Sequence, residues 1–177
     1  MSDQAIRLAI VDDDAEMIKL MTQRIQDLDT IELVGTANDV EKGLALIHAN
    51  KVDAVLIDLV MPGHDGFYML EELNRLRPNR PVCIMVSALN APHVISRAAE
   101  LGADHFVLKP FDMDLLFRRI AEISRYKNHG AFEGFKAVQQ YVLGLDVEVV
   151  GWFVQDEEVH GFKEHPEQGE AAFFAAG

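Results

Sequence analysis

Short apolar runs alternate with helical patterns five times over about 125 residues, and this alternation limits the fold more than any other feature. The apolar runs cover residues 6–11, 31–36, 54–57, 82–86 and 105–108. They are rich in branched side chains and stop at polar residues, as strands buried on both faces of a sheet do. We therefore predict an α/β fold with a doubly wound, five-stranded parallel sheet, whose helices cover both faces and form right-handed crossovers.

Capping residues mark where the intervening helices begin and end. The first helix is predicted over residues 15–28 and the fourth over residues 91–101, with Gly102 as its stop. The other three are predicted to begin at Asn38 or Asp39, at Asp65-Gly66 and at Asp112. An aspartate at these positions can accept hydrogen bonds from the first free amides of a helix, which is also the expected role of Asp14.

The alternation ends near Tyr126, so residues 1–126 are predicted to form the main domain. Residues 127–177 are predicted to be an acidic C-terminal extension of one helix and one strand, with no recognisable DNA-binding domain. Residues 131–154 are too apolar for a disordered tail. We expect them to pack against the main domain or against a second copy of the chain. In a homodimer, residues 147–154 would add a strand to a sheet edge.

Charge and hydropathy exclude several classes of protein. The net charge of −13 disfavours nucleic acid as a partner, because binding to phosphates needs basic residues. No apolar run approaches the roughly 18 residues of a membrane span, and the first ten residues lack a signal-peptide pattern. We therefore expect a cytoplasmic protein. The single cysteine, Cys83, lies in an apolar run and is predicted to be part of the core.

Four of the five predicted strands end at polar groups that would meet at one edge of the sheet. These groups are Asp12, Asp13 and Asp14 after the first strand, Asp58 after the third, Ser87 after the fourth and Lys109 after the fifth. Ligands bind at this edge in open α/β sheets. Converging carboxylates repel one another unless a cation lies between them, and a site of oxygen ligands suits Mg²⁺. A lysine and a serine beside it can contact a phosphoryl group.

Each group also has a purely structural interpretation. Asp14 is favoured as a helix cap, Ser87 could be a small turn residue, and Lys109 a solvated charge. The coincidence of all of them at matching strand ends favours the functional interpretation.

The motifs LAIVDDD, VLIDLVMPGHDG, MVSA and FVLKPF, in this order, resemble those of two-component response-regulator receiver domains, over residues 5–125. The resemblance implies a sheet of order 2-1-3-4-5, as in flavodoxin, and a cis bond between Lys109 and Pro110. It also implies the following roles. Asp58 would be both the phosphoacceptor and part of the Mg²⁺ site. The other members of that site would be Asp13 as a direct ligand, Asp12 as a ligand through water, and the Val60 carbonyl. Ser87 and Lys109 would contact the phosphoryl group, and Ser87 and Phe106 would be the switch residues.

The stretch LGADHFVLKPFDMDLL further resembles the receiver of the sporulation-initiation transcription factor. Two departures from that pattern are visible. Phe106 lacks the hydroxyl group of tyrosine, so a switch there would act through packing alone. The acidic residues 127–177 have no helix-turn-helix pattern, which disfavours a transcription factor.

The leading hypothesis is thus a bacterial phosphoprotein of a phosphorelay, not an enzyme, which accepts a phosphoryl group and changes partners. Its partners would be a histidine kinase or phosphotransfer protein and a downstream protein that the sequence does not identify. One alternative is a haloacid-dehalogenase-like phosphatase that uses Asp12 and Asp14, although Ser87-Ala88 stands where that family has an acidic pair. The other is a transcription regulator acting through its C-terminal segment.

Overall fold

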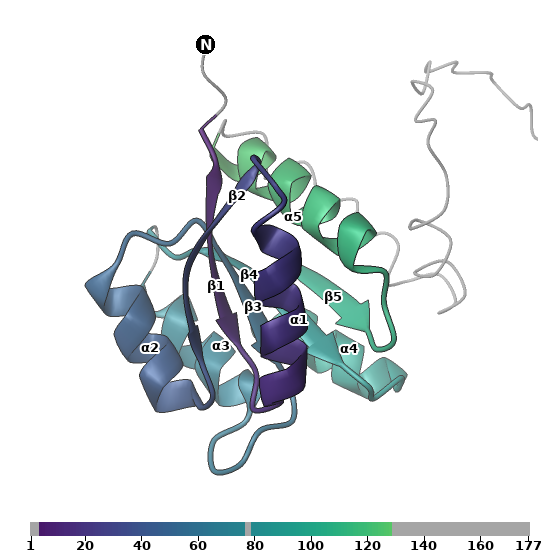
Figure 1. The fold of residues 1–177 in the computed structure, drawn as a ribbon. Coiled ribbons are helices and arrows are strands. Elements are labelled where there is room, and N and C mark those ends of the chain that lie inside the picture. Colours follow the sequence, from purple (N-terminus) through teal and green to yellow (C-terminus); the bar gives the residue numbers. More distant parts are fainter. Residues whose placement is uncertain (1–3, 77–78, 129–177) are drawn as a thin grey trace, which may run out of the picture.

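The computed structural model describes residues 4–76 and 79–128, in which strands and helices alternate (Figure 1). In chain order they are β1 (Ile6–Val11), α1 (Ala15–Ile25), β2 (Ile31–Ala37), α2 (Val40–Ala49), β3 (Ala54–Asp58), α3 (Gly66–Asn74), β4 (Val82–Ser87), α4 (Pro92–Glu100), β5 (His105–Leu108) and α5 (Met113–Asn128). The predicted alternation is confirmed. The predicted helix and strand of the C-terminal extension lie outside the described residues.

The five strands form one parallel sheet in the order β2-β1-β3-β4-β5. This is the order that the resemblance implied. β1, β3 and β4 have a neighbour on each side, so their carboxyl ends lie together in the middle of one sheet edge. Val11 pairs with Ile57 and Asp58 with Val86, which aligns the residues that follow β1 with the end of β3 and of β4.

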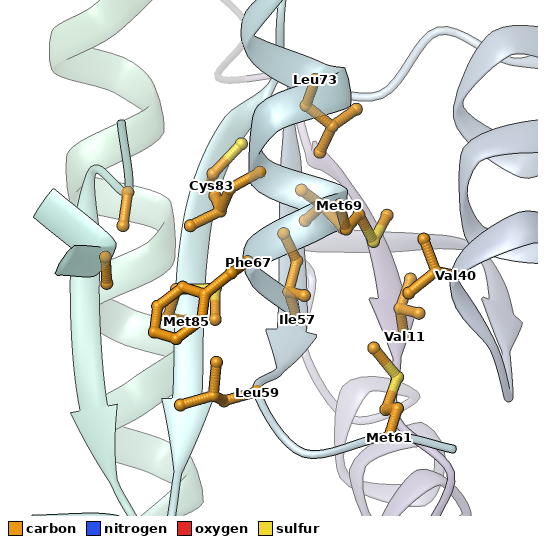
Figure 2. Packing of buried hydrophobic residues seen from close by; sticks show 14 of the residues in the cluster. Val11, Val40, Ile57, Leu59, Met61, Phe67, Met69, Leu73, Cys83 and Met85 are labelled. Atoms are coloured by element: carbon orange, nitrogen blue, oxygen red, sulfur yellow. The ribbon is translucent and has the colours of Figure 1, made fainter. Parts of the chain in front are cut away.

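Helices cover both faces of the sheet, and each face has its own apolar core. Side chains alternate across each strand, so the consecutive residues Val55 and Leu56 of β3 belong to different cores. The core under α2, α3 and α4 includes the labelled side chains of Figure 2 and contains the buried Cys83, as predicted. The core under α1 and α5 includes Met21 and Phe117.

Several boundaries differ from those predicted. α1 ends at Ile25 and not at residue 28, because the chain leaves the helix through short-range turns, in which the Leu28 N–H donates to the Ile25 carbonyl at 2.9 Å. β3 extends one residue further and includes Asp58. α5 continues to Asn128, two residues beyond the predicted limit of the main domain.

The predicted aspartate caps are confirmed. Asp14 accepts hydrogen bonds from the Glu16 and Met17 amides at 2.9 and 3.1 Å. Asp39, and not Asn38, caps α2, and Asp65 caps α3. Such caps stabilise a helix by about 1 kcal/mol each. Within the described part of the chain, no helix has the length and apolar character needed to cross a bilayer.

Candidate functional site

Two strand ends bring three carboxylates together. Asp12 follows β1 directly, and Asp58 is the last residue of the neighbouring strand β3. Asp13 is next in the chain, and carboxylate oxygens of Asp12, Asp13 and Asp58 all lie within 4.8 Å of one another. Asp12 and Asp58 are buried and Asp13 is exposed. The cluster therefore has a buried side and a side that opens to solvent.

Lys109 reaches this cluster from the far edge of the sheet. Its Nζ donates to Asp58 Oδ1 at 2.7 Å and to Asp12 Oδ2 at 3.0 Å. β4 lies between β5 and β3, and both β3 and β4 lie between β5 and β1, so these contacts need the long lysine side chain. Its backbone is fixed as well: the Lys109 N–H donates to the Ser87 carbonyl at 2.8 Å, and the following bond to Pro110 is cis, as the resemblance implied.

Backbone amides orient the two buried carboxylates. The Asp14 N–H donates to Asp12 Oδ1 at 2.8 Å, and the Val60 N–H donates to Asp58 Oδ2 at 2.8 Å. Each carboxylate thus has one oxygen on a backbone amide and the other on the Lys109 ammonium group. This arrangement holds the oxygens in place before any ligand binds.

Burial and charge act in opposite directions on the site. Burial raises the pKa of Asp58, and the neighbouring Asp12 carboxylate adds to the rise, while the hydrogen bond and charge of Lys109 oppose it. For Lys109, burial would lower the pKa, but the hydrogen bonds to Asp58 and Asp12 outweigh burial and raise it. Lys109 is therefore the cation that compensates the buried carboxylates.

The three acidic residues fit a divalent cation. They offer only carboxylate oxygens, which are the ligands that Mg²⁺ prefers, and one ammonium group does not neutralise three carboxylates. Asp14 does not belong to this group, since its carboxylate caps α1. The phosphatase alternative requires Asp12 and Asp14 to act together. In the structure Asp12 belongs to the acidic cluster, whereas Asp14 caps α1.

The other predicted site residues surround the cluster. Ser87 is buried at the end of β4, and its Oγ accepts a hydrogen bond from the Leu89 amide at 3.0 Å, within its own loop. Phe106 pairs with Met85 across β4 and β5 and packs against the core under α2, α3 and α4. Val60 as a whole residue is 59% exposed, and the role of its carbonyl as a metal ligand stays a prediction.

Gly66 is a site residue that sequence reasoning identified only as a helix start. A Cβ atom there would lie 2.6 Å from the Asp58 carbonyl oxygen and 3.0 Å from the Leu59 Cα. The Gly66 N–H also donates to the Leu59 carbonyl at 3.0 Å. The first turn of α3 thus packs directly behind Asp58, and this closeness requires glycine. The Asp65-Gly66 pair is a signal for a helix start, but nothing local indicates the contact with β3.

Comparisons with known proteins agree with this geometry. The family model described as response regulator receiver domain matches residues 8–121. A CheY-like response regulator receiver domain protein from Methanospirillum hungatei is 25% identical, with a TM-score of 0.65, over 71% of this chain and 98% of that one. The receiver domain of the Francisella response regulator 1452 is 27% identical, with a TM-score of 0.63, over 69% and 98%.

A third similar structure is the CheX–CheY–BeF3–Mg²⁺ complex from Borrelia burgdorferi. It is 28% identical, with a TM-score of 0.60, over 67% of this chain and 88% of that one. The further resemblance to the sporulation-initiation transcription factor stays a prediction.

Proposed function

The chain belongs to the response regulator receiver domain family, and on this premise we propose that Asp58 accepts a phosphoryl group in a step that depends on Mg²⁺. The observation that carries the proposal is the position of Lys109, whose ammonium group bonds to both Asp58 and Asp12. A cation beside a carboxylate at the open edge of a parallel sheet is suited to hold the charge of a phosphoryl group.

The reaction is a phosphoryl transfer from a phosphohistidine of a kinase or phosphotransfer protein, or from a small acyl phosphate. An Asp58 oxygen bonds to phosphorus while the bond from phosphorus to the donor nitrogen or oxygen breaks, and the donor atom keeps the electron pair. Lys109 neutralises charge on the transferred oxygens, and the Val60 amide keeps the other Asp58 oxygen oriented. Mg²⁺, when bound by Asp12, Asp13 and Asp58, supplies further charge neutralisation there.

We regard the chain as a phosphoacceptor and not as an enzyme that acts on separate substrates. Phosphorylation adds a charge of about −1.5 to −2. Ser87 lies at the end of β4, which is next to β3 and Asp58, and Phe106 lies in β5, the next strand. A movement of Ser87 toward the phosphoryl group would therefore change the packing of Phe106. The surface of α4, β5 and α5 is then the one that a downstream protein reads. The homodimer through residues 127–177 also stays a proposal.

Phosphorylation is tested on the full chain with a small acyl phosphate and Mg²⁺, followed by intact mass. Wild type should gain one phosphoryl group that hydroxylamine removes, and Asp58→Asn should gain none. Asp53→Asn is the matched control, because Asp53 precedes the same strand at its opposite end and should leave labelling intact. Labelling of Asp58→Asn at the wild-type rate would show that the assignment is wrong.

The metal is tested separately by titrating Mg²⁺ in the same assay. Asp13→Ala should need a higher Mg²⁺ concentration for half-maximal labelling than wild type. Asp14→Ala is its control, since Asp14 is the adjacent carboxylate but caps α1. If both variants shift the Mg²⁺ dependence equally, Asp13 has no specific role as a ligand.

A further inference from the structure

Helix α4 is attached at its N-terminus differently from the other helices of the described part of the chain. The other four each have an aspartate that accepts a first-turn amide: Asp14, Asp39, Asp65 and Asp112. α4 follows Ala91, which has no side-chain acceptor, and opens on Pro92. The loop of residues 88–91 connects Ser87 to the N-terminus of α4. This end of the helix is therefore not fixed by a side-chain cap.

A contact further along α4 ties it to α3. The guanidinium carbon of Arg97 lies 4.6 Å from the centroid of the Phe67 ring. This is within the range of a cation–π interaction, which extends to about 6 Å. Arg97 is exposed, whereas Phe67 is 8% exposed and belongs to the core that Figure 2 shows, beside Leu59 and Met85. The contact thus connects a surface cation on α4 to a buried ring on α3.

Phe67 has a fixed position relative to Asp58. It follows Gly66, which packs against the Asp58 carbonyl and has no space for a Cβ atom. The first turn of α3 cannot shift without moving the end of β3. The C-terminal end of α4 is held by α3, because the Asn74 side chain donates to the Leu101 carbonyl at 3.1 Å. The N-terminal part of α4 is the part that can move, because it lacks a side-chain cap and Arg97 contacts α3 through a long, exposed side chain.

We propose that the Arg97–Phe67 contact is a latch that holds α4 in its present position and opposes the change that phosphorylation drives. The inference rests on the proposed phosphorylation of Asp58. A displacement of α4 by about 2 Å, typical of helix shifts in switching proteins, takes the cation toward the limit of the interaction. The latch therefore stabilises the resting arrangement more than the displaced one. A contact that favours one of two states shifts the population between them.

The affinity for a phosphoryl analogue measures this population. An analogue that binds the displaced state better has an apparent affinity that rises with the population of that state. Exposed cation–π contacts have a strength that corresponds to about a 2- to 5-fold change in an equilibrium. Loss of the latch should therefore tighten binding of the analogue by about 2- to 5-fold.

The probe is beryllofluoride with Mg²⁺, titrated into the full chain and followed by NMR or calorimetry. Arg97→Gln should bind it about 2- to 5-fold more tightly than wild type, and Arg97→Lys, which keeps a cation, should stay within about 2-fold. Arg75→Gln is the matched control: it removes an exposed arginine charge from the end of α3, where Arg75 pairs with Glu72. It should not tighten binding.

The ring is tested with Phe67→Leu, which keeps an apolar side chain but removes the π face. Combined with Arg97→Gln it should tighten binding no more than Arg97→Gln alone, because both remove one contact. If Phe67→Leu does not fold, the three arginine variants decide alone. Equal affinities of Arg97→Gln and Arg75→Gln, or weaker binding by Arg97→Gln, would overturn the latch.

The proposed function fails in a different way. If the proposed function is wrong, wild type will bind beryllofluoride no better than Asp58→Asn does. That result would refute the latch as well, because the latch rests on the proposed function. If wild type binds in a manner that depends on Asp58 and the Arg97 variants are unchanged, the latch alone is wrong.

Discussion

Two arginine–aspartate pairs at the amino ends of the strands both make two side-chain hydrogen bonds but differ in burial. Arg80 donates to the two carboxylate oxygens of Asp104 at 2.8 and 2.7 Å, and Arg7 to those of Asp53 at 2.9 and 2.7 Å. A backbone amide also donates to each carboxylate, from Cys83 to Asp104 at 2.8 Å and from Arg7 to Asp53 at 3.0 Å. The first pair is 6% and 0% exposed and the second 18% and 18%.

This difference predicts unequal costs for the same substitution. In Asp104→Asn, one carboxylate oxygen becomes an NH2 group that faces a donor, and the Arg80 charge stays in a buried site. Removing one partner of a buried ion pair lowers the free energy of unfolding by about 3–5 kcal/mol. In Asp53→Asn, water reaches the guanidinium group of Arg7 and replaces part of the lost interaction. The expected loss is about 1–2 kcal/mol.

Urea unfolding of the full-length variants near neutral pH, followed by circular dichroism, measures both losses. Burial would raise the pKa of Asp53, but the hydrogen bonds from Arg7 outweigh burial and lower it, so the pair is intact in this assay. For a domain of this size, Asp104→Asn should also lower the melting temperature by about 10–20 °C. Equal losses for the two variants would refute the argument that burial decides the cost.

Two further predictions concern Asp58 and the glycine that packs against it. The raised pKa of Asp58 means that its ionised form destabilises the fold, so Asp58→Asn should become more stable than wild type as the pH rises through that pKa. Urea unfolding from about pH 4 to pH 8, without Mg²⁺, checks this, and a less stable variant at neutral pH contradicts it. Gly66→Ala should lower the free energy of unfolding by about 1–3 kcal/mol, since two of its three close contacts are backbone atoms of Asp58 and Leu59. If Gly66→Ala unfolds in urea as wild type does, α3 can move away from β3 to make room for the added methyl group.

The sequence by itself determined which elements form along residues 4–128 and, to within a few residues, where they begin and end. Short apolar runs, helical periodicity and capping residues depend only on neighbours along the chain. The five strands and five helices of the described residues, with the caps at Asp14 and Asp65, could therefore be predicted. The position of Asp58 at the end of a buried strand followed from the same local pattern. The strand order did not: it came from the resemblance to a family, because periodicity does not indicate which strands are neighbours.

Only the tertiary structure decided which distant side chains meet. Lys109 contacts Asp58 and Asp12 because the strand order places β5 only one strand away from β3 and two strands away from β1, within reach of a lysine side chain. The buried pair of Arg80 and Asp104 could not be predicted either, since both look like loop residues in the sequence. Such contacts depend on strand neighbours, register and side-chain length together, and these quantities are fixed only when the helices pack against both faces of the sheet.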